Sequence, residues 1–177
     1  MNCRSKMSAM TATVPLLALG LAVALNGCTG YQLGTSLPPG IRSVAVPVFA
    51  NKTNKSDLPI QATNATIQEL QRDGTLRLAP ADQADTILDV TATGYQLAPI
   101  RYANDRRTTA SEYRMTLTTH VVFRNRTTGA VLLQATVVSD ATTFPMTGDL
   151  TSAERSALPL ASQDLARKIV ERMLETW

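Results

Sequence analysis

Four stretches of the chain alternate between hydrophobic and polar residues, a period of two that is typical of β-strands with one buried face. They span residues 41–49, 86–97, 112–124 and 131–139. The side chains expected to face the core are Val44, Val46 and Val48, then Leu88, Val90 and Ala92, then Tyr113, Met115, Leu117, Thr119, Val121 and Phe123, then Val131, Leu133, Ala135 and Val137. The opposite side is rich in threonine, which suits strands whose second face stays wet. Residues 76–78 have the composition of a short edge strand.

Two further stretches repeat their hydrophobic residues at the period of a helix. The first spans residues 58–73 and is followed by Gly74, a fitting C-cap. Its expected inward residues are Ile60, Thr63, Ile67 and Leu70. The second begins at Thr151, where Thr-Ser-Ala-Glu has the pattern of a capping box, and Pro159 is expected to kink or restart it. Its apolar stripe comprises Leu165, Ala166, Ile169, Val170, Met173 and Trp177.

The order of these elements is strand, helix, short strand, three strands and helix. It predicts an α+β fold, a two-layer sandwich in which two amphipathic helices pack on one face of a mostly antiparallel, mixed four-stranded sheet. The other face of the sheet is expected to be polar. Residues 126–129 are short enough for a hairpin turn, and residues 98–111 are expected to form a longer loop between two strands.

The first 27 residues are typical of a bacterial signal peptide. Arg4 and Lys6 precede an uncharged apolar segment at 10–25, which is too short to span a membrane comfortably. Residues 25–28, Leu-Asn-Gly-Cys, resemble the lipobox of bacterial lipoproteins, although Asn26 departs from the small residue usual there. We therefore expect a lipoprotein signal peptide (1–27), a flexible tether that begins with the lipidated Cys28 (28–40) and a single α/β sandwich domain (41–177), held to a membrane by acyl chains.

Loss of the signal peptide nearly cancels the net charge. The chain has 17 basic and 14 acidic residues, and the two basic residues of the leader leave 15 against 14. This balance argues against a nucleic-acid partner, because such a domain needs a basic excess to offset phosphates. The charge is nevertheless uneven, since residues 101–126 contain six arginines and only two acidic residues.

The sequence contains no group of residues with the spacing of a catalytic or metal site. His120 is the only histidine, and after cleavage Cys28 would be the only cysteine, so histidine clusters and disulfides are excluded. His120 lies on the polar side of its predicted strand and has no evident nucleophile as a partner. No glycine-rich phosphate loop follows a strand. We therefore expect neither an enzyme nor a cofactor.

Five segments resemble, in order, the LptE family of lipopolysaccharide-assembly lipoproteins. They are residues 28–33 (CTGYQL), 44–53 (VAVPVFANKT), 84–88 (ADTIL), 112–117 (EYRMTL) and 128–132 (TGAVL). The sequence departs from the family at residues 57–59, where the family more often has glycine and an acidic residue. The resemblance implies a non-enzymatic protein of the outer membrane that plugs the lumen of the β-barrel LptD and binds lipopolysaccharide, with its domain facing the periplasm and the lumen. The alternative is a periplasm-facing regulatory or scaffold lipoprotein, such as an activator of peptidoglycan synthases.

The resemblance also suggests a role for four arginines near the 98–111 loop. They are Arg101, Arg106, Arg107 and Arg114. Lipid A carries phosphates, and the planar guanidinium group can donate two parallel hydrogen bonds to a phosphate. The same arginines could instead contact acidic residues of the barrel, or only keep a solvated loop soluble. These three roles remain open from the sequence.

Overall fold

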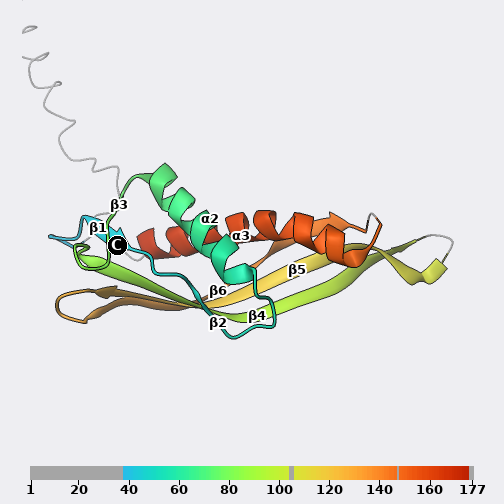
Figure 1. Ribbon diagram of the computed structural model, residues 1–177, viewed down its shortest axis with the longest axis horizontal. Helices are drawn as coiled ribbons and strands as arrows, with labels where there is room; N and C mark the ends of the chain where they lie inside the picture. The colour runs from blue at the N-terminus through green and yellow to red at the C-terminus, as the bar shows by residue number, and fades with distance from the viewer. Residues whose placement is uncertain (1–37, 104–105, 147, 176–177) are drawn as a thin grey trace, which may run out of the picture. The chain divides into compact units, whose positions relative to one another are not determined.

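The computed structural model describes residues 38–103, 106–146 and 148–175, without the side chains of residues 106–108. In this part of the chain, two helices cover one face of a six-stranded mixed sheet (Figure 1). The elements are β1 (Ser43–Ala45), β2 (Ala50–Asn51), α2 (Leu58–Asp73), β3 (Arg77–Leu78), β4 (Thr86–Ala103), β5 (Arg106–Asn125), β6 (Val131–Pro145) and α3 (Leu150–Leu174). The α+β class and the packing of two helices on one face of the sheet are confirmed.

The sheet differs from the prediction in strand number and direction. Its order is β3-β1-β4-β5-β6, and β2 pairs with β4 beside this path. The pairings of β1 with β3, β1 with β4 and β2 with β4 are parallel, whereas the β4–β5 and β5–β6 pairings are antiparallel. Six strands therefore replace the predicted four, and the sheet is mixed rather than mostly antiparallel.

The first predicted strand, residues 41–49, is divided into β1 and β2. Pro47 lies between them, where its missing N–H cannot support a continuous ladder. The interruption also changes which side chains face inward: Val48 is 70% exposed, whereas Phe49 is buried. The backbone N–H of Phe49 donates to the hydroxyl of Thr63 on α2 (3.0 Å), which satisfies that buried group without a strand partner.

Helix α2 has the predicted bounds, and its C-cap is confirmed. Gly74 has the left-handed φ of 74°, and its N–H donates to the carbonyl of Leu70. The predicted inward face is partly wrong, because Ile60 is 59% exposed. The face that is buried instead contains small residues, including Ala62 and Thr66, and it packs against α3. Small side chains allow two helices to approach closely, and a pattern read only from large hydrophobic residues misses them.

Strands β4 and β5 extend far into the predicted 98–111 loop. Ala98 pairs with Arg114, and Arg101 pairs with Glu112, with register shifts toward the tip. The predicted long loop is therefore wrong, and the two strands form one hairpin. Pro99 is compatible with β4 because this half of the strand has no second neighbour among the described strands.

Strand β6 follows a hairpin turn at the predicted place. Gly129 has a φ of 71°, and its N–H donates to the carbonyl of Asn125 at 3.0 Å. The side chain of Asn125 also accepts hydrogen bonds from two backbone N–H groups of the turn. The strand then continues to Pro145, beyond the predicted end at residue 139. Val131, predicted to face the core, is 55% exposed beside the turn.

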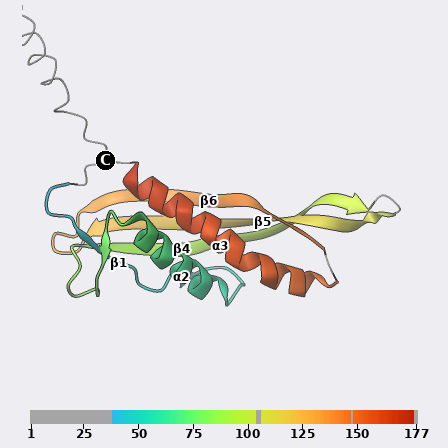
Figure 2. The ribbon, with the colours of Figure 1, turned by 90° about the horizontal axis from the view of Figure 1, so that it is seen from above.

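Helix α3 lies obliquely across the sheet beside α2 (Figure 2). Its N-cap is Asp149, whose carboxylate accepts from the N–H of Ser152 at 2.9 Å, so the predicted cap at Thr151 is wrong. Pro159 does not end the helix. It lies on the exposed side, where water can satisfy the carbonyl that loses its N–H partner. Trp177, the last residue of the predicted stripe, lies outside the described residues.

The core lies between these helices and the covered face of the sheet. The alternation predicted for β5 is confirmed, since Leu117, Val121 and Phe123 are all 0% exposed. They belong to one buried cluster with Leu165 and Ile169 of α3, as the helical stripe predicted.

Candidate functional site: the open sheet face

Neither of the described helices covers the opposite face of the sheet, which we call the open face (Figure 1). Its central part comprises Thr91, Thr93 and Gln96 on β4, Thr116, Thr118 and His120 on β5, and Gln134 and Thr136 on β6. None of these side chains is fully buried. The predicted polar face is therefore confirmed, and it is the surface of the sheet on which a ligand or partner could lie.

The structure places two of the four predicted arginines on the outer end of the β4–β5 hairpin. Arg101 forms an ion pair with Glu112 at 3.3 Å, and its side chain is 76% exposed. Arg114 is exposed two residues further along β5, on the same side of the strand as Glu112. Arg106 and Arg107 open β5, but their side chains lie outside the described residues.

The remaining arginines of the basic stretch lie at the other end of the hairpin and have structural partners. Arg124 pairs with Asp89 across β4 and β5 at 2.7 Å. The Nε atom of Arg126 donates to the carbonyl of Ala84 at 2.6 Å. Arg114 and Arg124 are ten residues apart in an extended strand, or roughly 33 Å. The basic stretch of the sequence is thus not a single basic surface in space.

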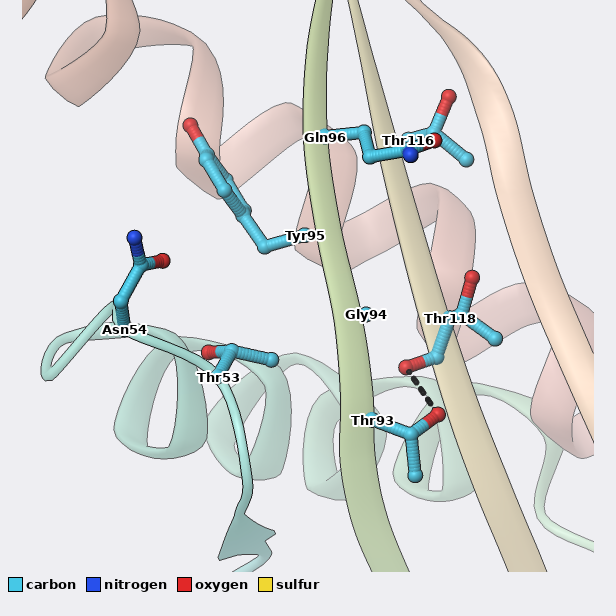
Figure 3. Close-up of a pocket in the computed structure, with 8 residues that line it drawn as sticks. All are labelled: Thr53, Asn54, Thr93, Gly94, Tyr95, Gln96, Thr116 and Thr118. Atoms are coloured by element: carbon cyan, nitrogen blue, oxygen red, sulfur yellow. Dashed lines mark hydrogen bonds between the residues drawn. The ribbon is translucent and has the colours of Figure 1, made fainter.

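An open hollow of about 420 Å³ lies where the open face meets the segment between β2 and α2 (Figure 3). Its lining residues are Thr53, Asn54, Thr93, Gly94, Tyr95, Gln96, Thr116 and Thr118. The hollow is not evident in the sequence, because its lining residues come from three separate segments, 53–54, 93–96 and 116–118. One signal was available: Gly94 interrupts an otherwise regular strand, and a glycine there often marks a bulge or a close approach.

Three side chains from separate elements fix the wall of this hollow. The phenol of Tyr95 donates to Glu154 on α3 at 2.5 Å, and Lys55 forms an ion pair with the same carboxylate. The ammonium of Lys55 also lies 5.1 Å from the centre of the Tyr95 ring. Burial and the hydrogen bond to Glu154 raise the pKa of Tyr95 far above its ordinary value, so the phenol remains protonated and can donate.

Asp85 holds β1 against the start of β4. Its carboxylate accepts three hydrogen bonds: from the N–H of Arg42 (3.0 Å), the N–H of Ser43 (3.0 Å) and the hydroxyl of Ser43 (2.7 Å). The hydroxyl of Ser43, followed by the backbone N–H of Arg42, holds the pKa of this carboxyl below its ordinary value. This residue belongs to the 84–88 segment that resembles LptE, and its role here is structural.

Because the pKa of Asp85 is lowered by folding, its stabilising effect should be complete above the unfolded-state pKa near 4 and disappear as the pH falls through the folded value. We expect Asp85→Asn to lower the urea midpoint at pH 7 and to flatten its decline below about pH 4. The pKa of Asp149 is lowered as well, so some decline should remain. The control Asp82→Asn removes an exposed carboxylate nearby and should leave the midpoint at pH 7 unchanged. If the urea midpoints of the wild type and Asp85→Asn fell equally steeply below pH 4, this role would be contradicted.

Neither a metal site nor a membrane-spanning helix is found within the described ranges. They contain no group of three or more histidine, cysteine, aspartate or glutamate residues placed to hold a metal ion. No helix there is both long enough and apolar enough to cross a bilayer. His120, on the open face, lies 3.2 Å from the amide of Gln134.

The same arrangement of strands and helices occurs in other bacterial proteins of known structure. A Xanthomonas campestris protein matches with a TM-score of 0.56 at 12% identity, over 80% of this chain and 91% of its own. A hypothetical protein of Chlamydia trachomatis gives 0.55 at 12%, over 77% and 97%, and the PelC dodecamer of Paraburkholderia phytofirmans gives 0.52 at 18%, over 80% and 92%. These likenesses define a structural class and show the fold alone.

The family within this class is identified from the sequence. No curated protein matches the chain. The profile of the LptE family, described as lipopolysaccharide-assembly, matches residues 41–173. This match covers nearly the whole described domain, and the chain therefore belongs to the LptE family of lipopolysaccharide-assembly proteins.

Proposed function

We propose that this protein is an outer-membrane lipoprotein, anchored through acyl chains on Cys28, that occupies the lumen of the LptD β-barrel and assists lipopolysaccharide assembly without catalysing a reaction. The observation that carries this proposal is the family match over residues 41–173. The family is associated with lipopolysaccharide transport, and the order of the matching segments after a lipobox agrees with it.

The open face supports a position inside a barrel. The lumen of an outer-membrane barrel is polar, and a plug must present hydrogen-bonding groups to it. The uncharged polar side chains of β4, β5 and β6 provide such a surface without the cost of removing many charges from water.

The tip of the β4–β5 hairpin supports contact with a phosphorylated ligand or with acidic barrel residues. Arg101, Arg106, Arg107 and Arg114 all lie on the terminal part of these two strands. Arg114 is exposed and forms no ion pair with an acidic side chain among the described ones, whereas Arg101 already forms an ion pair with Glu112. We therefore propose Arg106, Arg107 and Arg114 as the principal contacts, with Arg101 contributing less.

The test uses the full-length tagged chain, purified from membranes in detergent with its partners. We expect LptD to co-purify and labelled lipopolysaccharide to bind, with binding weakened by salt. Arg106→Glu/Arg107→Glu should weaken lipopolysaccharide binding by about tenfold or more, because each charge-assisted hydrogen bond contributes roughly 1.5–3 kcal/mol. The control Arg77→Glu/Arg155→Glu makes the same charge change at exposed sites away from the tip.

Each outcome of this experiment has a distinct meaning. Loss of LptD with unchanged lipopolysaccharide binding would assign the arginines to the barrel contact. No change in either would leave the tip without a role in binding. Co-purification of a penicillin-binding protein in place of LptD would overturn the proposed function in favour of a regulatory lipoprotein.

A further inference from the structure

The hollow on the open face has a lining that suits a neutral, hydroxyl-rich ligand. None of its eight lining residues is charged, and seven of them carry a hydroxyl or amide side chain. A phosphate site would be expected to include arginine, lysine or a helix N-terminus, and an acyl-chain site would be mostly apolar. Hydroxyl and amide groups each donate and accept hydrogen bonds, as do the hydroxyl groups of a sugar.

Several of these groups have no partner within the described part of the protein. The side-chain amides of Asn54 and Gln96 and the hydroxyl of Thr116 form no hydrogen bond there with another side chain or the backbone. In Figure 3, Gln96 and Thr116 extend from neighbouring strands on the same side, and Asn54 projects from the segment that borders the hollow. Their hydrogen-bonding capacity is therefore available to a ligand.

The wall of the hollow is held in place before any ligand binds. Asn51 accepts hydrogen bonds from the N–H (2.9 Å) and hydroxyl (2.7 Å) of Thr53, and its amide donates to the carbonyl of Lys55 (2.8 Å). Lys55 is in turn paired with Glu154. A site that is already ordered loses less conformational entropy when it binds a ligand.

The floor of the hollow depends on a glycine. A β-bulge between Ala92 and Gly94 shifts the register of β4 against β5. A Cβ atom on Gly94 would lie 3.1 Å from the Cβ of Thr118, closer than ordinary contact. The glycine thus leaves a stretch of backbone uncovered between the side chains, and bulges of this kind are common beside binding sites.

We propose that this hollow binds a neutral saccharide unit of an envelope glycan, through Asn54, Gln96 and Thr116. Strand β2 pairs with β4 at Thr91 and Ala92, and the segment at Thr53 and Asn54 then continues along the same edge of β4. A peptide strand that paired with β4 at the hollow would have to occupy the place of this segment. A saccharide therefore suits the hollow better than a peptide strand. The glycan could come from the sugars of lipopolysaccharide or from an N-acetylglucosamine polymer such as peptidoglycan. The proposal depends on the lining alone and does not require the LptD partnership.

The test is an NMR titration of the ¹⁵N-labelled full chain in a detergent without a sugar headgroup. One probe is the dephosphorylated oligosaccharide released from lipopolysaccharide, and the other is an N-acetylglucosamine tetramer. We expect saturable shifts in the side-chain amides of Asn54 and Gln96 and in the backbone N–H of Gly94, with a dissociation constant on the order of 1 mM. A response to one probe alone identifies the source of the glycan, and a response to both supports the shared chemistry.

Matched variants localise the effect. Gln96→Ala/Thr116→Ala should weaken binding by about tenfold, because two hydrogen bonds are lost. Gln134→Ala/Thr136→Ala removes the same two residue types from the open face outside the hollow and should stay within about twofold of wild type. The NMR spectrum itself shows whether each variant is folded. Absence of shifts with both probes up to about 50 mM, or equal weakening in the control, would overturn the proposal. The titration contains no LptD, so absence of saccharide binding would leave the proposed LptD partnership standing, and absence of LptD from the purified complex would leave the saccharide result standing.

Discussion

Replacing Phe123 with alanine is expected to lower the free energy of unfolding by about 3–5 kcal/mol. The ring is fully buried on β5, between the paired residues Leu88 of β4 and Leu133 of β6, in the same cluster as Leu165 and Ile169 of α3. Truncation would lose the favourable free energy of transferring the ring from water to the core. It would also leave a cavity, because the surrounding structure can relax only partially.

Urea unfolding followed by circular dichroism measures this loss. Val138→Ala is the matched control: its side chain lies on the neighbouring strand β6 but is 43% exposed, so we expect a change below about 1 kcal/mol. A comparably small loss for Phe123→Ala would mean that the inward face of β5 is assigned to the wrong side.

The inward face of β5 was predictable because its alternation is long and has no interruption. A shift of one residue would move Met115, Leu117 and Phe123 together to the wet side, so the pattern leaves a single register. The same reasoning fails for residues 41–49. There, Pro47 breaks the strand, and the large side chain of Phe49 becomes buried in place of Val48.

The lengths of the strands were underestimated for a different reason. Residues 98–111 contain arginines, a proline and few large apolar side chains, so the local pattern favours a loop. They are nevertheless extended, because β4 and β5 pair with each other through this region and continue the ladder begun at the core. Pairing between distant residues can override local propensity in this way.

The candidate site was predictable only where it depends on one continuous segment. The arginines of the hairpin tip are close in sequence, and their position near the end of two strands follows from the hairpin. The hollow and its wall are different, since Tyr95 and Glu154 are separated by 59 positions and meet only when α3 crosses the sheet. No local sequence pattern could predict the contact between Tyr95 and Glu154.

The lipid anchor gives the other prediction with a large expected effect, although residues 1–37 lie outside the described part of the chain. Replacing Cys28 with serine should abolish incorporation of labelled palmitate and leave the precursor uncleaved. The serine hydroxyl is a far weaker nucleophile than a thiolate and should not accept diacylglycerol, and the signal peptidase acts only after that transfer. The measurement is metabolic labelling followed by gel mobility of the chain.

Cys3→Ser is the matched control, because Cys3 is the other of the two cysteines and lies in the segment expected to be removed. It should label and migrate like the wild type. Each buried methylene contributes about 0.8 kcal/mol to membrane binding, so one acyl chain holds a protein only marginally, whereas two or more anchor it stably. Under the proposed function, the acyl chains on Cys28 therefore provide the stable attachment of the domain to the membrane. A Cys28→Ser chain that still migrates as the mature form and stays with the membrane would show that attachment does not involve this cysteine.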